Sequence, residues 1–324
     1  MSTLETNNIS KYSGNNVSID DSLKLKSYTT SQRDALPSPE AGDTIYNSDT
    51  GTIDFYNGSS WNATSSTTFT VDISYLVIAG GGAGGSYSAG GAGGYRSSYG
   101  TDVSGANSST ESTITITPDG STNYAVAVGG GGSSGSNGST STFYNISSVG
   151  GGHGETPGTG NSGGSGAGGG SSWTSSYNGG AGTASQGMAG GRANAVYHHD
   201  LGGGGGGASA NGTASSGTTA GSGGDGLASG ITGSSVYRAG GGRGRAQNGT
   251  NGSAGQGQGT NTGGGGSPGS SGASDPGDSG VVIVRYPTAN ATITVGAGLT
   301  SSTTTSGSDT IVTFTAGTGN VQFS

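Results

Sequence analysis

The three histidines of the chain and their acidic neighbours are candidates for metal binding or proton transfer. His198, His199 and Asp200 follow one another directly, and His153 lies two residues before Glu155. Imidazole and carboxylate groups can bind a metal ion or move a proton. Neighbouring side chains of an extended segment point to opposite sides, and His153 is distant in the sequence, so we predict no metal site. The cluster is typical of a surface loop and is also compatible with a recognition loop.

Isolated aromatic residues interrupt the glycine-rich sequence around this cluster. Exposed tyrosine, tryptophan and histidine side chains can bind sugars or proteins at a low cost in conformational entropy. We therefore treat a set of aromatic and polar residues as candidate receptor contacts. They are Trp173, Tyr177, Tyr197, His198, His199, Asp200 and Tyr237.

A small basic group follows the last of these residues. Arg238, Arg243 and Arg245 lie among glycines and resemble an arginine-glycine segment of RNA-binding tails. The whole chain, however, has 10 basic and 18 acidic residues and a net charge of -8. Because phosphate neutralisation needs clustered Lys and Arg, we expect no nucleic-acid partner, and we expect these arginines to bond nearby carbonyl groups.

The sequence carries no pattern typical of catalysis or of cofactor binding. A glycine run begins at Gly80 after an apolar strand, as in phosphate-binding loops, but no Gly-Lys-Ser/Thr follows it. Serine is so frequent that its presence near a histidine does not indicate a nucleophile and its base. We therefore predict a protein that is not an enzyme and that needs no cofactor.

Composition limits how such a chain can fold. Of its 324 residues, 76 are glycine, 27% are hydrophobic and 9% are charged, and cysteine is absent. Glycine raises the entropy cost of folding and adds no side chain to bury. A chain with so few apolar residues is disordered by default, and the alternative is a structure held by backbone hydrogen bonds. We also expect no signal peptide, because the N-terminus has no basic region followed by an apolar one, and no transmembrane segment, because no apolar stretch approaches ~20 residues.

Two unbroken apolar runs frame the glycine-rich region. Leu76, Val77 and Ile78 precede the first glycine run, and a second run closes the region. An apolar run without alternation predicts a strand buried on both faces. We expect the two runs to form a structural clasp, where the region starts and ends at one place. The second run consists of Val281, Val282, Ile283 and Val284.

Glycines between these strands recur briefly at every third position, as at 129, 132, 135 and 138. Three residues per turn is the period of polyproline II, in which glycine lets backbones touch. We therefore predict an elongated, multi-module fibre protein that is mostly β, with a glycine-rich, polyproline-II-like (polyglycine-II) helical bundle. A flexible Gly/Ser linker is the alternative, and isolated aromatics within so long a segment disfavour it.

Composition shifts divide the chain into four expected parts. They are an attachment and oligomerisation segment (1–30), a small β-module with strands near Ile45 and Phe55 (31–70), the glycine-rich domain (71–287) and a C-terminal β-module (288–324). Within the third part, residues 113–117 and 124–128 read as a β-hairpin. The first and last parts are too small to form a core alone.

Several motifs resemble a known group of proteins. The chain is similar to glycine-rich domains of tail-fibre and virion structural proteins of bacteriophages, especially marine phages that infect cyanobacteria. The motifs are YLVIAGGG at 75–82, GGYR at 93–96 and SGVVIVRY at 279–286, with LKLK at 23–26, QRDAL at 32–36, GDTIYN at 42–47 and FYNGSSW at 55–61.

The resemblance implies an exposed virion fibre or adhesin that forms a homotrimer. It implies attachment through the N-terminus to other virion proteins of the tail or capsid, and binding to a host cell-surface glycan or outer-membrane protein. By the same resemblance, loops 173–177 and 197–200 would lie at the distal tip. A purely structural virion component, such as a capsid decoration or neck fibre, is the alternative function.

Overall fold

A computed structural model describes residues 24–64, 69–269 and 273–324 of the chain. The chain divides into two compact units, Met1–Thr68 and Phe69–Ser324. Residues 1–23, most of the expected attachment segment, lie outside the described residues.

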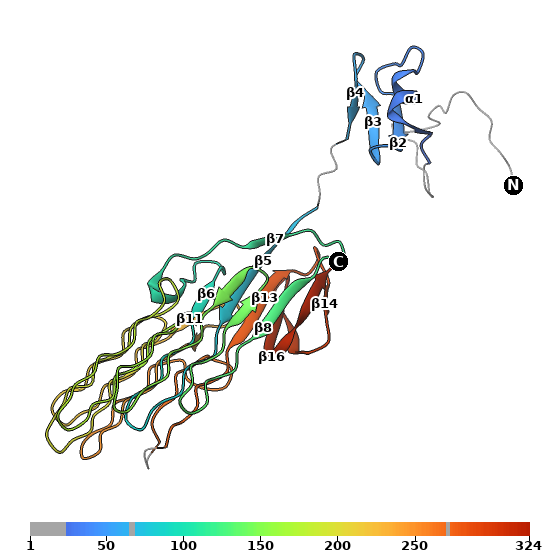
Figure 1. Cartoon of the computed structure of the whole chain (residues 1–324). Helices are drawn as coiled ribbons and strands as arrows, with labels where there is room; N and C mark the ends of the chain where they lie inside the picture. The colour runs from blue at the N-terminus through green and yellow to red at the C-terminus, as the bar shows by residue number, and fades with distance from the viewer. Residues whose placement is uncertain (1–23, 65–68, 270–272) are drawn as a thin grey trace. The chain divides into compact units, whose positions relative to one another are not determined.

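The first unit is a four-stranded sheet with one short helix (Figure 1). Its strands lie in the order β1-β2-β3-β4, with β1 parallel to β2 and the other neighbours antiparallel. Thr29 begins the helix with a capping box, in which the side chains of Thr29 and Gln32 accept each other's backbone N–H. The strands predicted near Ile45 and Phe55 are confirmed. The elements are β1 (Ser27–Tyr28), α1 (Thr30–Asp34), β2 (Thr44–Asn47), β3 (Thr52–Tyr56) and β4 (Trp61–Ala63).

One face of this sheet is covered by α1, and the other face is exposed. On one face, Arg33 of α1 donates from Nη1 to Oδ2 of the fully buried Asp54 at 2.8 Å. On the other face, Tyr46 and Ile53 lie directly opposite each other on β2 and β3, and Phe55 follows two residues along β3. These three side chains are 41–43% exposed. The first unit therefore presents an apolar sheet face to its surroundings.

The second unit contains a large sheet with the strand order β10-β9-β8-β16-β13-β5-β6. Strand β7 also pairs with β5, and β14 and β15 pair with β16. A separate hairpin joins β11 to β12, and a short 3-10 turn, η1 (Gly105–Asn107), follows β6. The strands are β5 (Val71–Ile78), β6 (Tyr95–Ser97), β7 (Ile114–Ile116), β8 (Tyr124–Val128), β9 (Ser141–Phe143), β10 (Ile146–Ser148), β11 (Leu227–Ser229), β12 (Val236–Arg238), β13 (Val281–Pro287), β14 (Ile293–Val295), β15 (Leu299–Ser306) and β16 (Asp309–Phe323).

The two strands expected to form the clasp, β5 and β13, pair directly with each other. They run antiparallel, with Val77 opposite Val282 and Ile78 opposite Val281. Val77 and Val282 belong to one apolar cluster, and Ile78 and Val281 belong to a second cluster on the other face. Burial on both faces, predicted from the unbroken apolar runs, is confirmed. Full burial of each such side chain contributes about 1.5–3 kcal/mol.

The sheet curls until its edge strand β10 reaches β5 and β6, which makes a nearly closed, barrel-like sheet. Arg96 of β6 donates from Nη1 to the carbonyl of Ser147 of β10 at 3.3 Å. Ser148 of β10 donates from Oγ to the carbonyl of Val77 at 2.8 Å. Gln186, from a turn of the glycine-rich region, bonds to both edges. Its carbonyl accepts from the N–H of Tyr95 at 3.0 Å, and its side-chain oxygen accepts from the N–H of Val149 at 2.8 Å. Gly94, just before β6, also donates to the carbonyl of Val149, just after β10, at 2.8 Å, so these groups of the two edges are satisfied.

Residues 288–324 belong to the same compact unit as the glycine-rich region. Strand β16 lies between β13 and β8, and its residues Val312 and Phe314 are fully buried. The predicted strands near 113–117 and 124–128 are present, but the predicted hairpin between them is wrong. Strand β7 pairs with β5, whereas β8 pairs with β16 and β9. The C-terminal strand, far away in sequence, occupies the edge of β8.

The expected polyproline-II-like (polyglycine-II) helical bundle is wrong. The described residues form a mostly β fold built on a nearly closed, barrel-like sheet, and no helical bundle is present among them. The prediction took the glycine period as the organising unit of the fold. The large apolar side chains instead lie mainly in strands, and these strands collect into one sheet.

Glycine-rich extended segments run from this sheet to the opposite end of the second unit (Figure 1). Successive backbone N–H groups in a segment donate to different neighbouring segments in turn. Counted from Gly80 in the segment after β5, the first and fourth donors reach residues 136–139, the second and fifth reach residues 275–278, and the third reaches residue 91. These bonds are Gly80 to Ser139, Gly81 to Asp278, Gly82 to Gly91, Ala83 to Ser136 and Gly84 to Asp275, at 2.9–3.2 Å.

Glycine is required here because the segments lie backbone against backbone. A Cβ on Gly131 would overlap the carbonyl of Gly277. Most glycines of the region meet a neighbouring backbone in the same way, so a methyl group would force the segments apart. The adjacent Gly130 is exposed, and among the described residues no atom lies within 4 Å of a Cβ placed on it.

These two neighbouring glycines provide a matched test. We expect Gly131→Ala to lower the free energy of unfolding by about 1–3 kcal/mol, because the new methyl group overlaps a backbone carbonyl. Gly130→Ala should change it by less than about 1 kcal/mol, with a small gain from a less flexible unfolded chain. Urea unfolding of the two variants and the wild type measures the difference. Equal stability of the two variants would contradict backbone-to-backbone packing.

Candidate functional site

Three tight turns of the same kind lie at the end of the glycine-rich segments, which we call the tip. Each turn is closed by a backbone pair between its first and fourth residues and leaves two residues at its apex. One apical residue has left-handed backbone in two of them: the second, His198 (φ 63°), in 196–199 and the first, Gly217 (φ 58°), in 216–219. Histidine and glycine both occur in this conformation. The turns are 172–175, 196–199 and 216–219.

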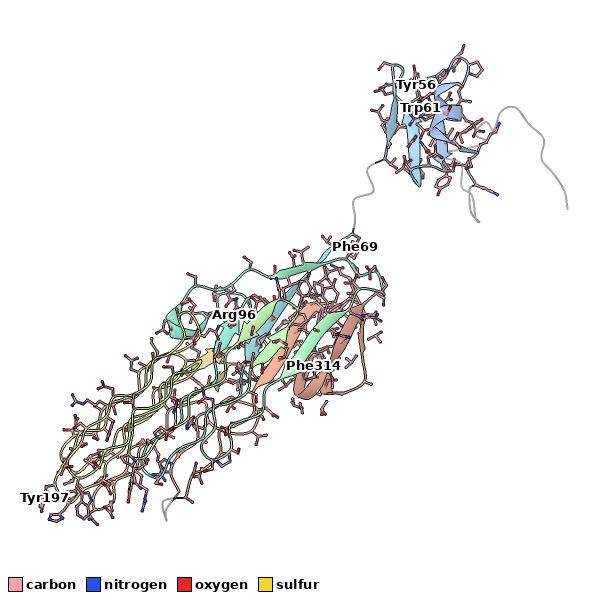
Figure 2. The ribbon with its side chains drawn as sticks, in the orientation of Figure 1. Tyr56, Trp61, Phe69, Arg96, Tyr197 and Phe314 are labelled. Atoms are coloured by element: carbon pink, nitrogen blue, oxygen red, sulfur yellow. The ribbon has the colours of Figure 1, made fainter. Side chains whose placement is uncertain are left out.

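Aromatic side chains from two of these turns contact one another. The ring of His198 lies 5.2 Å from that of Trp173 and 4.0 Å from that of Tyr197, measured between ring centroids. Tyr197 is 71% exposed and Trp173 is 47% exposed. Figure 2 shows Tyr197 at the end of the unit opposite Phe314 of the sheet. The tip therefore carries a cluster of accessible aromatic rings.

A small apolar cluster supports these turns from below. Leu201, Ala220 and Ala246 are buried together, and the partly buried Val196 packs against them. The side-chain amide of Asn248 also donates to the carbonyl of His198 at 3.2 Å. The turns are thus held in place by side-chain packing as well as by backbone hydrogen bonds.

A pocket of about 470 Å³, the tip pocket, opens beside the turns. Its walls come from five segments that are distant in sequence and meet at this end of the unit. The guanidinium of Arg245 lies over the ring of Tyr87, 5.2 Å from the ring centroid. The side chains that give the pocket its chemistry are those of Tyr87, Thr156, Ser172, Asp200, Arg245 and Gln247.

Backbone hydrogen bonds fix these walls relative to one another. The N–H of Arg245 donates to the carbonyl of Tyr87 at 2.8 Å, and the N–H of Tyr87 donates to Oγ1 of Thr156 at 3.2 Å. The N–H of Gly202 donates to the carbonyl of Arg245 at 3.0 Å. A Cβ on Gly202 would overlap the carbonyl of Tyr87, so this close approach requires glycine. Hydrogen bonds thus hold the walls of the pocket in place.

Asp200 links the pocket to the aromatic cluster. Burial raises the pKa of its carboxyl above the ordinary value, and the neighbouring Trp173 side chain opposes this shift. Neither Asp200 nor Arg245 forms an ion pair with another described residue. Nδ1 of His199 is buried and has no hydrogen-bond partner in the described part of the chain. The pocket therefore holds a carboxylate and a guanidinium that form no ion pair with each other or with another described charge.

The structure brings together most of the residues that the sequence suggested as contacts. Trp173, Tyr197, His198, His199 and Asp200 lie at or beside the tip turns. The other two candidates lie elsewhere. Tyr177 is half-buried where its segment pairs with Ala193, and Tyr237 is in β12, whose hairpin packs on the sheet.

Sequence reasoning missed Tyr87, Thr156 and Gln247 as parts of the same site. Each lies where a glycine run is interrupted, which is the signal that singled out Trp173. Arg245 was noticed but was expected to bond nearby carbonyl groups, and it stacks on Tyr87 instead. Arg243 does bond a carbonyl, that of Pro268, at 3.4 Å.

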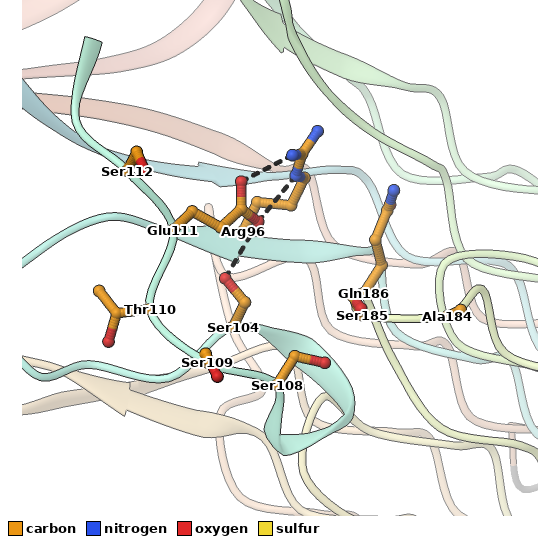
Figure 3. Close-up of a pocket in the computed structure, with 10 residues that line it drawn as sticks. All are labelled: Arg96, Ser104, Ser108, Ser109, Thr110, Glu111, Ser112, Ala184, Ser185 and Gln186. Atoms are coloured by element: carbon orange, nitrogen blue, oxygen red, sulfur yellow. Dashed lines mark hydrogen bonds and ion pairs between the residues drawn. The ribbon is translucent and has the colours of Figure 1, made fainter.

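A larger cavity, of about 700 Å³, lies beside the sheet and is drawn in Figure 3. Its charged groups are already paired. Arg96 of β6 donates from Nε and Nη2 to the two carboxylate oxygens of Glu111, at 2.9 and 2.6 Å. Glu111 also accepts from the hydroxyl groups of Tyr75 (2.8 Å) and Ser104 (3.1 Å). This network joins the loop after β6 to the sheet and has a structural role.

The pairing sets the protonation of Glu111. Burial raises its pKa, but the hydrogen bonds from Arg96 and Tyr75 and the charge of Arg96 outweigh burial and hold the pKa below its ordinary value. The ionised carboxylate therefore stabilises the fold at pH values above the unfolded pKa of about 4.3, and this contribution is lost as pH falls through the lower folded pKa.

We expect Glu111→Gln to lower the free energy of unfolding at pH 7 by about 1–3 kcal/mol, because charged hydrogen bonds to a part-buried arginine are lost. The difference from the wild type should shrink as pH falls below about 4, because the wild-type carboxylate is then protonated as well. Urea unfolding at several pH values tests this expectation. Asp275→Asn, at an exposed position, is the control and should change stability by less than about 0.5 kcal/mol. A difference independent of pH would contradict the assignment.

No group of three or more His, Asp or Glu residues in the described ranges is placed to hold a metal ion. Within those ranges, no helix combines the length and the apolar character needed to cross a membrane.

Comparison with known proteins gives one match. A family model described as a glycine-rich domain matches residues 56–287. No curated protein and no solved structure matches the chain. The matched region covers more than half of the 324 residues and contains both clasp strands and every segment that lines the tip pocket. The chain belongs to the glycine-rich domain family.

Proposed function

We propose that this protein is an exposed fibre or adhesin of a bacteriophage virion and that it attaches the particle to a host cell surface through the tip. The observation that carries the proposal is the cluster of accessible aromatic rings, Trp173, Tyr197 and His198, on tightly closed turns. The similarity of the boundary motifs to phage fibre proteins supports the virion assignment.

The physical basis is the cost of exposing these rings. Large aromatic side chains contribute to stability when they are buried, and Tyr197 is instead 71% exposed at the apex of a turn. Exposed aromatics that gather in one place are typical of binding surfaces. Because backbone hydrogen bonds already hold the turns, binding restricts the rotation of few further bonds. The entropy cost of binding is therefore lower. The fold thus supplies a rigid support for contacts.

The proposal includes a homotrimer, attachment to other virion proteins through the N-terminal unit, and a host glycan or outer-membrane protein as receptor. It includes no catalytic step and no nucleic-acid partner. Weak contacts from several copies on one particle would add to a strong attachment. The exposed face formed by Tyr46, Ile53 and Phe55 is suited to contacts with other copies or with other virion proteins.

A purely structural virion component, such as a capsid decoration or neck fibre, is the second candidate. Its support is that the sheet, the glycine segments and the apolar face of the first unit are sufficient for a structural role. The aromatic cluster distinguishes the two functions, because a structural component gains nothing from Trp173 and Tyr197 at an exposed tip.

Binding of the fluorescently labelled full chain to a panel of bacterial cells, cyanobacteria included, tests the proposal. We expect saturable binding to some strains, and we expect the double variant Tyr197→Ser/His198→Asn to bind at least about tenfold more weakly, as for central aromatic contacts. Asparagine tolerates the left-handed backbone at 198, which preserves the turn. Tyr237→Ser, an exposed tyrosine away from the tip, is the matched control. Absence of binding to every strain, or equal binding by both variants, would favour the structural role.

A further inference from the structure

We propose that the tip pocket binds an uncharged sugar unit through Asp200, Arg245 and Gln247. This inference rests on the proposed function, because it names the class of surface molecule that the tip would recognise. Its volume of about 470 Å³ lies within the ~300–1,000 Å³ range of small-ligand pockets.

The hydrogen-bonding groups of the pocket match those of a sugar. A sugar hydroxyl both donates and accepts, so a ring with several hydroxyls needs acceptors and donors on the same wall. The Asp200 carboxylate accepts, the Arg245 guanidinium donates, and the Gln247 amide does both. A carboxylate with two oxygens can accept from two neighbouring hydroxyls of one ring. The set therefore favours a ligand rich in hydroxyl groups over an apolar ligand.

The charges of the pocket favour an uncharged ligand. One carboxylate and one guanidinium line it, and neither forms an ion pair with a described residue. An anionic ligand would gain from Arg245 but would be repelled by Asp200, and a cationic ligand would meet the opposite problem. A neutral polyol can use both groups without either repulsion.

The surroundings of the pocket add apolar contact and rigidity. The rings of Tyr87 and Pro157 form part of its wall, and such rings can pack against the C–H groups of a sugar. Trp173 lies at the adjoining turn, next to Asp200, where further units of a sugar chain would pass. Because backbone bonds fix Tyr87, Thr156 and Arg245, the pocket loses little freedom on binding.

The experiment uses the full chain on an array of bacterial surface glycans, both uncharged and acidic, followed by calorimetry with the free sugar of the strongest signal. We expect binding to uncharged glycans. Asp200→Asn and Arg245→Gln should each weaken it by about ten- to a hundredfold, as for hydrogen bonds to charged groups. Asp72→Asn and Arg192→Gln, at exposed positions away from the pocket, are the charge-matched controls and should bind as the wild type does. Unchanged thermal unfolding shows that each variant is folded.

Binding confined to acidic glycans, no binding to any glycan, or binding unaffected by Asp200→Asn and Arg245→Gln would each overturn the inference. The proposed function fails separately. If the pocket variants attach to cells as strongly as the wild type does, while Tyr197→Ser/His198→Asn does not, the tip is an adhesive surface that recognises something other than a sugar in this pocket.

Discussion

Backbone-to-backbone hydrogen bonding at distances that only glycine allows is the interaction on which the second unit depends. Donors along one segment reach several neighbours in turn, so each segment is tied on more than one side. Each bond contributes only about 0.5–1.5 kcal/mol net, but the bonds also satisfy polar groups whose burial without a partner would be costly. A Cβ at Gly131 or Gly202 would overlap a facing carbonyl, which explains why the region has so few other residue types.

This packing leaves the unit with little apolar side chain outside the sheet, so the sheet must hold both ends of the region. Strands β5 and β13 pair through Val77 and Val282 and bring the start and the end of the glycine segments to one place. Strand β16 pairs with β13 and contributes Phe314 to the apolar cluster that contains Val77 and Val282. Gln186 connects the glycine region to the sheet, because it lies in the glycine region and bonds to both edges of the barrel-like sheet.

Local features of this fold could be predicted from the sequence, and long-range ones could not. Strand positions follow from apolar runs, as at Val77 and Val282, because burial on both faces leaves an unbroken pattern. The pairing of β8 with β16 joins residues nearly two hundred positions apart, and the sequence of neither strand indicates which strand it pairs with. The tip site was predictable where an aromatic such as Trp173 interrupts glycine. Its pocket was not, because Tyr87, Asp200 and Arg245 meet only through the packing of separate segments.

The function proposed for the tip requires that the glycine backbone be ordered, since mobile segments could not hold the turns and the pocket in one arrangement. Hydrogen–deuterium exchange of the full chain at neutral pH tests this requirement most directly. Amides such as those of Gly166, Gly205 and Gly241, bonded to neighbouring segments at 2.8–3.0 Å, should exchange as slowly as those of β5 and β13. Exchange at the rate of an unstructured chain throughout residues 150–268, with protection only in the sheet, would contradict an ordered glycine region.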